Sequence, residues 1–361
     1  PLLAQAQALL GRAAVLQPPA PALDAEQGQV SYLRGAIAYR RQDLAAAQTH
    51  WQAYRDAAER QLAAQPQSRQ SWLELSYALN NLGTLAEARG EHGQAAEAFT
   101  RSIELKRKAL TAAPAAERQE LEADLADSLS WLATAREAQG RPLLALPLYR
   151  EQSQRLAWLL AASKDAPAWR YRLVQARLRF ASLAAALGEQ AAAIDAYRQA
   201  EQALRSLIAG DPARLTWQRD LAYAQIQRGW TQALDGQTAE GESAVGAGVA
   251  AIQALLARAD TPEWRRLAAL GQGDLARLAA QRGALGQAGE LAAAAAHALE
   301  ALHARRADDR RTAAALAETW TVQGEIQAAQ GDRAGAQARW QRAAELLAAQ
   351  AEDSSDRHVL D

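Results

Sequence analysis

Residues 71–103, SWLELSYALNNLGTLAEARGEHGQAAEAFTRSI, decide the fold of this chain. They read as two amphipathic helices, because apolar residues recur at helical spacing on both sides of the glycine-containing segment ARGEHG. Glycine just beyond a helical run supplies the left-handed conformation that ends a helix without a steric clash. The same pattern returns along the sequence at intervals of 47–50 residues. The stretch is therefore one unit of a repeated helix pair.

Three aligned columns of residues support this repeat. The column of Gly83 on the first helix and the column of Ala95 on the second hold Gly or Ala in all seven units. The column of Phe99 is aromatic in five of the seven units. Small residues let the backbones of two antiparallel helices approach closely, and we expect the ring to fill the gap to the next pair. The first column is Gly35, Gly83, Ala133, Ala181, Gly229, Ala276 and Gly324.

The unit resembles the tetratricopeptide repeat (TPR) signature, W-x2-L-G-x2-Y followed by A-x3-F-x2-A. The matching residues are Leu82, Gly83, Ala86, Ala95, Phe99 and Ser102 in one unit, and Trp320, Gly324, Ala336, Trp340 and Ala343 in another. The resemblance spans residues 25–350 and implies an all-α superhelical solenoid of about seven antiparallel helix pairs. The period is near 48 residues, longer than the 34 of the family, so we expect longer helices.

The sequence divides into one partial unit, seven full units and a tail. Residues 1–23 read as the second helix of a preceding repeat followed by a proline-rich linker, which suggests a piece of a longer protein. The full units are expected at 24–65, 67–113, 115–163, 166–209, 211–259, 262–306 and 308–350, and residues 351–361 form a polar tail. The second helix of the fifth unit contains Gly241, Gly246 and Gly248. Each Gly costs roughly 1 kcal/mol relative to Ala inside a helix, so we expect a weak helix there.

Composition limits the partners and the compartment. The net charge is −1, so there is no electrostatic case for nucleic acid. No run of 18 apolar residues exists, so we expect neither a membrane span nor direct membrane contact. The absence of cysteine leaves the compartment open, with the cytoplasm expected before the periplasm. The bias toward Ala and Arg suggests a bacterial source.

The resemblance implies that the first helix of each repeat lines a concave groove that binds a protein or peptide. Counting from the small column gives the candidate residues on that face. They are Tyr32, Tyr39, Tyr77, Asn80, Thr84, Glu87, Asp127, Ser130, Tyr223 and Trp230. An asparagine in such a groove can bond a peptide backbone as both donor and acceptor, although Asn80 equally reads as an ordinary polar surface residue.

One known ligand class is disfavoured by the neighbours of Asn80. The TPR proteins that bind chaperone tails hold a terminal carboxylate with a clamp of Lys and Asn side chains. Asn80 matches one asparagine of that clamp. Its neighbours on the same helix face, Thr84 and Glu87, supply no cation. The resemblance therefore implies a groove without identifying its ligand.

Patterns for catalysis, metals and cofactors are missing from the sequence. His297 and His303 are six residues apart and fall on different helix faces, unlike a helical metal pair. No phosphate-binding loop of the G-x-x-x-x-G-K-[ST] type occurs, and the glycines of 271–283 follow a helix instead of a strand. Carboxylates such as Glu120 and Asp124 read as a solvated helix face. We expect no enzyme activity, no cofactor and no metal.

Three functions remain open at this level. The leading one is a non-catalytic scaffold that binds a protein or peptide, as the sensing or recruiting region of a larger bacterial signalling protein. The second is a small-molecule sensor in which the ligand closes the superhelix, which a pocket around Tyr223 and Trp230 would support. The third is an accessory region of a kinase or STAND-type ATPase whose catalytic domain lies outside this chain.

Overall fold

The computed structural model describes residues 5, 6, 8–10, 12, 21–163 and 166–359. The helix expected within residues 1–23 lies largely outside this part of the chain, and Lys164 and Asp165 of one linker lie outside it as well. All regular structure among the described residues is helical: seven consecutive helix pairs and one 3-10 turn, Ala115–Glu117. The predicted all-α fold of about seven helix pairs is confirmed.

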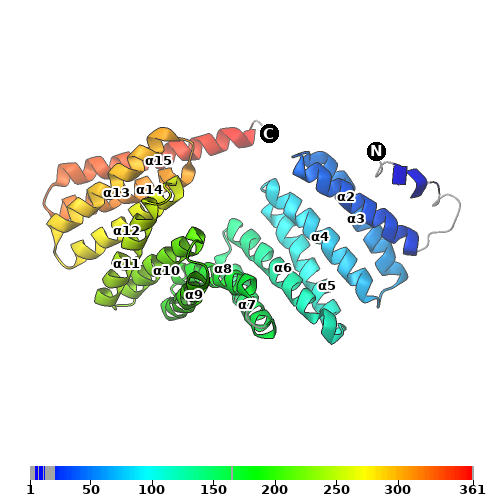
Figure 1. Cartoon of the computed structure of the whole chain (residues 1–361). Helices are drawn as coiled ribbons and strands as arrows, with labels where there is room; N and C mark the ends of the chain where they lie inside the picture. Colours follow the sequence, from blue (N-terminus) through cyan, green and yellow to red (C-terminus); the bar gives the residue numbers. More distant parts are fainter. Residues whose placement is uncertain (1–4, 7, 11, 13–20, 164–165, 360–361) are drawn as a thin grey trace. The chain divides into compact units, whose positions relative to one another are not determined.

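The chain divides into two compact units, residues 1–180 and 181–361, called here the N-terminal and C-terminal units. The N-terminal unit contains α2 (Pro21–Arg40), α3 (Leu44–Ala64), α4 (Arg69–Ala88), α5 (His92–Thr111), α6 (Arg118–Ala138) and α7 (Pro142–Ala162) (Figure 1). The division falls inside α8 (Pro167–Ala186). The C-terminal unit contains α9 (Gln190–Gly210), α10 (Leu215–Leu234), α11 (Thr238–Leu256), α12 (Pro262–Gln281), α13 (Leu285–Arg305), α14 (Arg310–Ala329) and α15 (Arg333–Val359).

Within each unit every helix packs against the next one along the chain. In the C-terminal unit the first helices of successive pairs, α10, α12 and α14, also contact one another. Buried leucine and alanine side chains fill the layers between pairs, and Leu75, Leu125 and Leu204 are fully buried examples. The core is therefore distributed along the stack, as in a repeat protein whose units contact only their neighbours.

The two helices of each pair are joined by the same kind of turn. The second residue after the first helix has a positive φ in all seven turns: Gln42, Gly90, Gly140, Gly188, Gly236, Gly283 and Gly331. The N–H of the following residue then bonds a carbonyl five residues back, as Glu91 does to Ala86 at 2.8 Å. This bond across a left-handed residue is the Schellman motif, which glycine adopts without strain. Gln42 is the one residue other than glycine with positive φ in the described part of the chain.

Glycines of the small column lie under an aromatic ring of the second helix in two of the pairs of the N-terminal unit. A Cβ atom on Gly83 would lie 2.6 Å from the ring of Phe99, and one on Gly35 would meet the ring of Trp51. The ring therefore lies over the glycine of its own pair, which the sequence analysis did not foresee. Phe99 also reaches Trp131 of the next pair, with ring centroids 5.9 Å apart.

The pair α10 and α11 uses glycine on both of its helices. A Cβ atom on Gly229 would lie 2.6 Å from the carbonyl oxygen of Gly241, and one on Gly248 would lie 2.7 Å from that of Ala222. These neighbours are backbone atoms, so the two helices touch with no room for a side chain. Two of the three glycines that predicted a weak helix therefore serve packing. Gly246 has no atom within 4 Å of such a Cβ.

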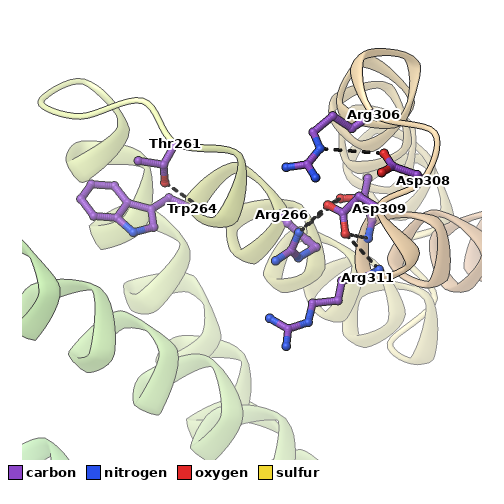
Figure 2. Close-up of polar contacts among 8 residues, drawn as sticks. Thr261, Trp264, Arg266, Arg306, Asp308, Asp309 and Arg311 are labelled. Carbon is purple, nitrogen blue, oxygen red and sulfur yellow. Dashed lines mark hydrogen bonds and ion pairs between the residues drawn. The ribbon is translucent and has the colours of Figure 1, made fainter. Parts of the chain in front are cut away.

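Side-chain caps fix where several helices begin, and Figure 2 shows two of them in the C-terminal unit. At the start of α12, Thr261 Oγ1 accepts a hydrogen bond from the N–H of Trp264 at 3.2 Å. At the start of α14, Asp309 Oδ1 accepts from the N–H of Arg311 at 3.1 Å. Arg266 on α12 approaches the same carboxylate, with Nη1 3.2 Å from Oδ2. The cap of one pair is thus tied to the pair before it.

The last helix is longer than the sequence analysis proposed. α15 continues to Val359, whereas the last unit was expected to end near residue 350. No glycine or proline follows Gly335 in the sequence, so the chain offers none of the usual signals that stop a helix.

Candidate functional site

A groove of about 580 Å³ opens on the N-terminal unit along the first helices α2, α4 and α6. These helices present equivalent positions to the same side, and second helices close the floor between them. The lining residues are Ala25, Gln29, Tyr32, Tyr54, Glu74, Tyr77, Asn80, Asn81, Lys106, Glu120, Asp124, Asp127 and Trp131. The groove thus combines aromatic rings, amides and carboxylates.

Tyrosine hydroxyls connect the helices around this groove. Tyr77 on α4 donates to Asp124 Oδ2 on α6 at 2.8 Å, across 47 residues of sequence. Tyr54 on α3 donates to Glu74 Oε2 on α4 at 2.7 Å. Burial is the main cause that raises the pKa of both tyrosines, and the neighbouring carboxylates raise it further. Both hydroxyls therefore remain protonated donors at neutral pH.

Lys106 enters the floor of the groove from α5. Its side chain is almost fully buried, and Nζ donates to Ser128 Oγ at 3.0 Å and to the carbonyl oxygen of Asp124 at 3.2 Å. The same ammonium lies 5.1 Å from the centroid of the Tyr77 ring. Burial lowers the pKa of Lys106 to about 8, against the opposing charges of Asp124 and Asp127. This lysine is therefore cationic at neutral pH and loses its proton under mildly alkaline conditions.

The groove differs from other recesses of the same unit in its charge. A recess of about 280 Å³ among α3, α4 and α5 is lined by three arginines and three glutamates, including Arg89 and Glu97. The groove on α2, α4 and α6 is lined by four carboxylates and one lysine, and no arginine lines it. The groove therefore has an excess of negative charge that the recess among α3, α4 and α5 does not have.

The structure brings together four of the ten residues predicted for a binding face. Tyr32, Tyr77, Asn80 and Asp127 all line the groove. Asn80 is 7% exposed, and its Nδ2 donates to Ser128 Oγ on α6 at 3.2 Å. Its amide is thus engaged within the protein. Tyr32 is 40% exposed and remains accessible.

Four other predicted residues of the N-terminal unit lie outside the groove lining. Tyr39 packs against a tryptophan of its own pair, with centroids 5.3 Å apart. Thr84 donates to a carbonyl one turn back on its own helix at 2.9 Å. The carboxylate of Glu87 lies 3.1 Å from Nδ1 of His92. Ser130 is half-buried on α6.

The last two predicted residues belong to the C-terminal unit. Tyr223 is partly covered, and burial raises the pKa of its hydroxyl. Trp230 has the guanidinium of Arg277 over its ring at 5.5 Å. Arg277 Nη1 also lies 3.0 Å from Glu318 and 3.6 Å from Asp274. Burial raises the pKa of the Asp274 carboxyl to about 7. Trp230 is thus part of a cation–π and ion-pair cluster.

Sequence reasoning missed most of the charged groove. It treated Glu120 and Asp124 as a solvated face, yet both line the groove. It also considered first helices alone, so Tyr54 of α3 and Lys106 of α5 were not candidates. The signal for Lys106 was its rarity, because the chain has three lysines among 40 cationic residues.

Comparison with known proteins supports the fold. No family model and no curated protein matches this sequence. BtubC (BKLC) from P. vanneervenii is similar in structure, with a TM-score of 0.51 and 19% identity over 72% of this chain and 91% of that one. The apo form of RapI matches with a TM-score of 0.51 and 11% identity, over 88% of this chain and 97% of that one. A tetratricopeptide repeat protein from Parabacteroides merdae matches with a TM-score of 0.45 and 14% identity, over 89% and 93%.

These identities relate the chain to its neighbours through the fold alone. The predicted all-α solenoid of helix pairs is confirmed at that level. Within the described part of the chain, no helix has the length and apolar character needed to cross a membrane.

Proposed function

We propose that this chain is a protein-binding helical scaffold whose groove on α2, α4 and α6 holds an extended peptide segment of a partner. The observation that carries the proposal is the groove, in which aromatic rings and hydrogen-bonding side chains share a volume of about 580 Å³. Aromatic anchors in a recess with polar surroundings supply most of the binding energy in many protein interfaces. Asn81 adds an amide that can donate to and accept from a peptide backbone.

The proposed role is non-catalytic. The groups that resemble catalytic side chains, Tyr77 and Lys106, are hydrogen-bonded to neighbouring helices and hold the repeats together. Sensing or partner recruitment in a bacterial signalling protein is the form of this function that the sequence resemblance suggests. The groove geometry is compatible with that form because it is open along three successive repeats.

Two half-exposed tryptophans provide a matched test. Trp131 lines the groove and is 42% exposed, whereas Trp158 lies on α7 in a different recess and is 45% exposed. Peptides would be selected from a random displayed library on the full chain, and their dissociation constants measured by fluorescence anisotropy. We expect Trp131→Ala to weaken binding roughly ten-fold or more, as for an aromatic interface anchor, and Trp158→Ala to leave it unchanged. Failure to select any peptide, or equal loss in both variants, would refute the proposal.

A further inference from the structure

We propose that the groove selects a cationic side chain, so that the bound peptide segment carries arginine or lysine. This inference rests on the peptide-binding function proposed above and adds the chemistry of the ligand. Three features of the groove support it: an excess of carboxylates, neutral hydrogen-bond donors to two of them, and a buried lysine held beside an aromatic ring.

Two carboxylates of the groove, Glu74 and Asp124, accept side-chain hydrogen bonds from neutral donors. Glu74 accepts hydrogen bonds from the hydroxyl of Tyr54 and the amide of Gln70, both at 2.7 Å, and both donors are neutral. Asp124 accepts from the hydroxyl of Tyr77, which is also neutral. A carboxylate has about four lone-pair sites, so each still has acceptor capacity for a guanidinium or ammonium.

Two carboxylates of one helix line the groove. Glu120 and Asp124 are four residues apart on α6, which places them on one helix face. Glu120 is exposed. Burial is the largest cause of the raised pKa of Tyr77, and the negative charges of Asp124 and Glu120 raise this pKa further. Like charges at this spacing repel each other, and a ligand cation between them would relieve the repulsion.

Aromatic rings flank these carboxylates. Tyr32 on α2 and Trp131 on α6 are 40% and 42% exposed and line the same groove. The face of an aromatic ring attracts a cation, and Trp attracts it most strongly. A recess that combines carboxylates with uncovered rings therefore complements a cationic side chain through both its charge and its apolar stem.

Lys106 shows within the protein how this groove accommodates an ammonium. It lies over the ring of Tyr77 and bonds Ser128 Oγ, with Asp124 and Asp127 close enough to influence its pKa. Asp127 is also paired with Arg172. Asp127 thus has a cationic partner from outside the groove lining, whereas the hydrogen-bond donors to Glu74 are neutral.

An anionic ligand is the opposing case. Lys106 could attract a carboxylate, but its Nζ is buried and already bonded to Ser128 and to the Asp124 carbonyl. An incoming carboxylate would also meet Glu74, Glu120 and Asp124. Lys106→Met separates the two cases, because removal of this positive charge should strengthen binding of a cationic ligand and weaken binding of an anionic one.

The test uses the full chain and three fluorescein-labelled, end-capped octapeptides of alanine with two arginines, two citrullines or two glutamates. Citrulline keeps the shape of arginine without its charge. We expect the arginine probe to bind about ten-fold tighter than the citrulline probe and the glutamate probe to be weakest. Glu120→Gln should weaken the arginine probe roughly three- to five-fold. The control Glu104→Gln removes an exposed carboxylate of α5 that does not line the groove, and should have no effect.

Each alternative result has a defined meaning. Equal binding of the arginine and citrulline probes, with both lost on Trp131→Ala, would overturn the cationic ligand and leave the peptide-binding function standing. Equal weakening by Glu120→Gln and Glu104→Gln would show nonspecific charge attraction and overturn the inference. Failure of every probe and of the displayed library would overturn both proposals. If spermidine competes as strongly as the arginine peptide, the ligand is a small polyamine, and the proposal that the cation belongs to a peptide is overturned.

Discussion

The contact between α10 and α11 provides the sharpest structural prediction. Gly229→Ala would place a Cβ atom 2.6 Å from the carbonyl oxygen of Gly241 and 2.7 Å from the backbone nitrogen of Val245. Backbone atoms inside helices cannot rotate away as a side chain end can. The helices must therefore separate, and the packing between them is lost along their length.

The magnitude follows from two opposing terms. Replacing Gly by Ala inside a helix stabilises it by about 1 kcal/mol, and overpacking a close contact costs about 1–3 kcal/mol or more. Because the contacts here are with backbone, we take the upper part of that range, about 2–3 kcal/mol, and expect a net loss of about 1–2 kcal/mol. Gly246→Ala, on α11 with no atom within 4 Å, retains the favourable term alone and should stabilise the protein by up to about 1 kcal/mol.

Chemical unfolding of both variants, followed by helical circular dichroism, would measure this difference. Hydrogen exchange over residues 215–256 would show whether the loss is local to this pair, since repeat arrays need not unfold in one step. We expect the midpoint to fall for Gly229→Ala and to rise slightly for Gly246→Ala. Equal midpoints for the two variants would show that the glycines are not required for close packing, and would restore the view of α11 as a weak helix.

Three further predictions concern one turn and two buried ionisable groups. Gln42→Gly should raise the unfolding free energy by about 1 kcal/mol, because Gln42 has a φ of 65° that glycine adopts without strain; no gain in thermal midpoint would contradict this. Lys106 has a folded pKa of about 8, below its ordinary 10.5, so the unfolded chain binds more protons between these values. Stability should therefore rise between pH 8 and 10.5 by at most about 3 kcal/mol, and Lys106→Met, measured by urea unfolding, should remove that rise. Asp274 has a folded pKa of about 7, above its ordinary 3.8, so stability should fall as pH rises between these values. Asp274→Asn should exceed the wild type in unfolding free energy at pH 8 but not at pH 3; equal differences at both would refute the assignment.

The fold was predictable because its signals are local. A glycine after a helical run, such as Gly90, indicates a turn from the local sequence alone. The small column likewise predicted a close helix approach, which the structure shows at Gly229, where a Cβ atom would lie 2.6 Å from the carbonyl oxygen of Gly241. The position of the Phe99 ring and the packing role of Gly241 could not be predicted from local sequence, because each depends on which atoms of the partner helix lie opposite. Helix propensity alone predicts that Gly241 destabilises α11, whereas the close contact with Gly229 leaves no space for a larger residue at this position.

The groove was predictable in part for the same reason. Tyr77 and Asp127 were found because first helices repeat the same face, so a position counted on one helix transfers to the next. Asp124 was assigned to solvent because nothing on α6 itself reveals that Tyr77, 47 residues earlier, donates to it. The binding role of these residues stays a prediction. Comparing the peptide affinities of the Trp131→Ala and Trp158→Ala variants would test it.

The position of Lys106 changes the interpretation of Asn80 as part of a carboxylate clamp. Along α4 the neighbours of Asn80 include no cation, and this argued against a carboxylate clamp. In three dimensions Ser128 joins the two, since it bonds both the amide of Asn80 and the ammonium of Lys106. A cation is therefore present beside Asn80, on a helix that the counting did not include. It does not restore the clamp, because the same turn of α6 brings Asp124 and Asp127 toward that lysine. The carboxylates outnumber it around the groove, so the ligand that complements the site is a cation.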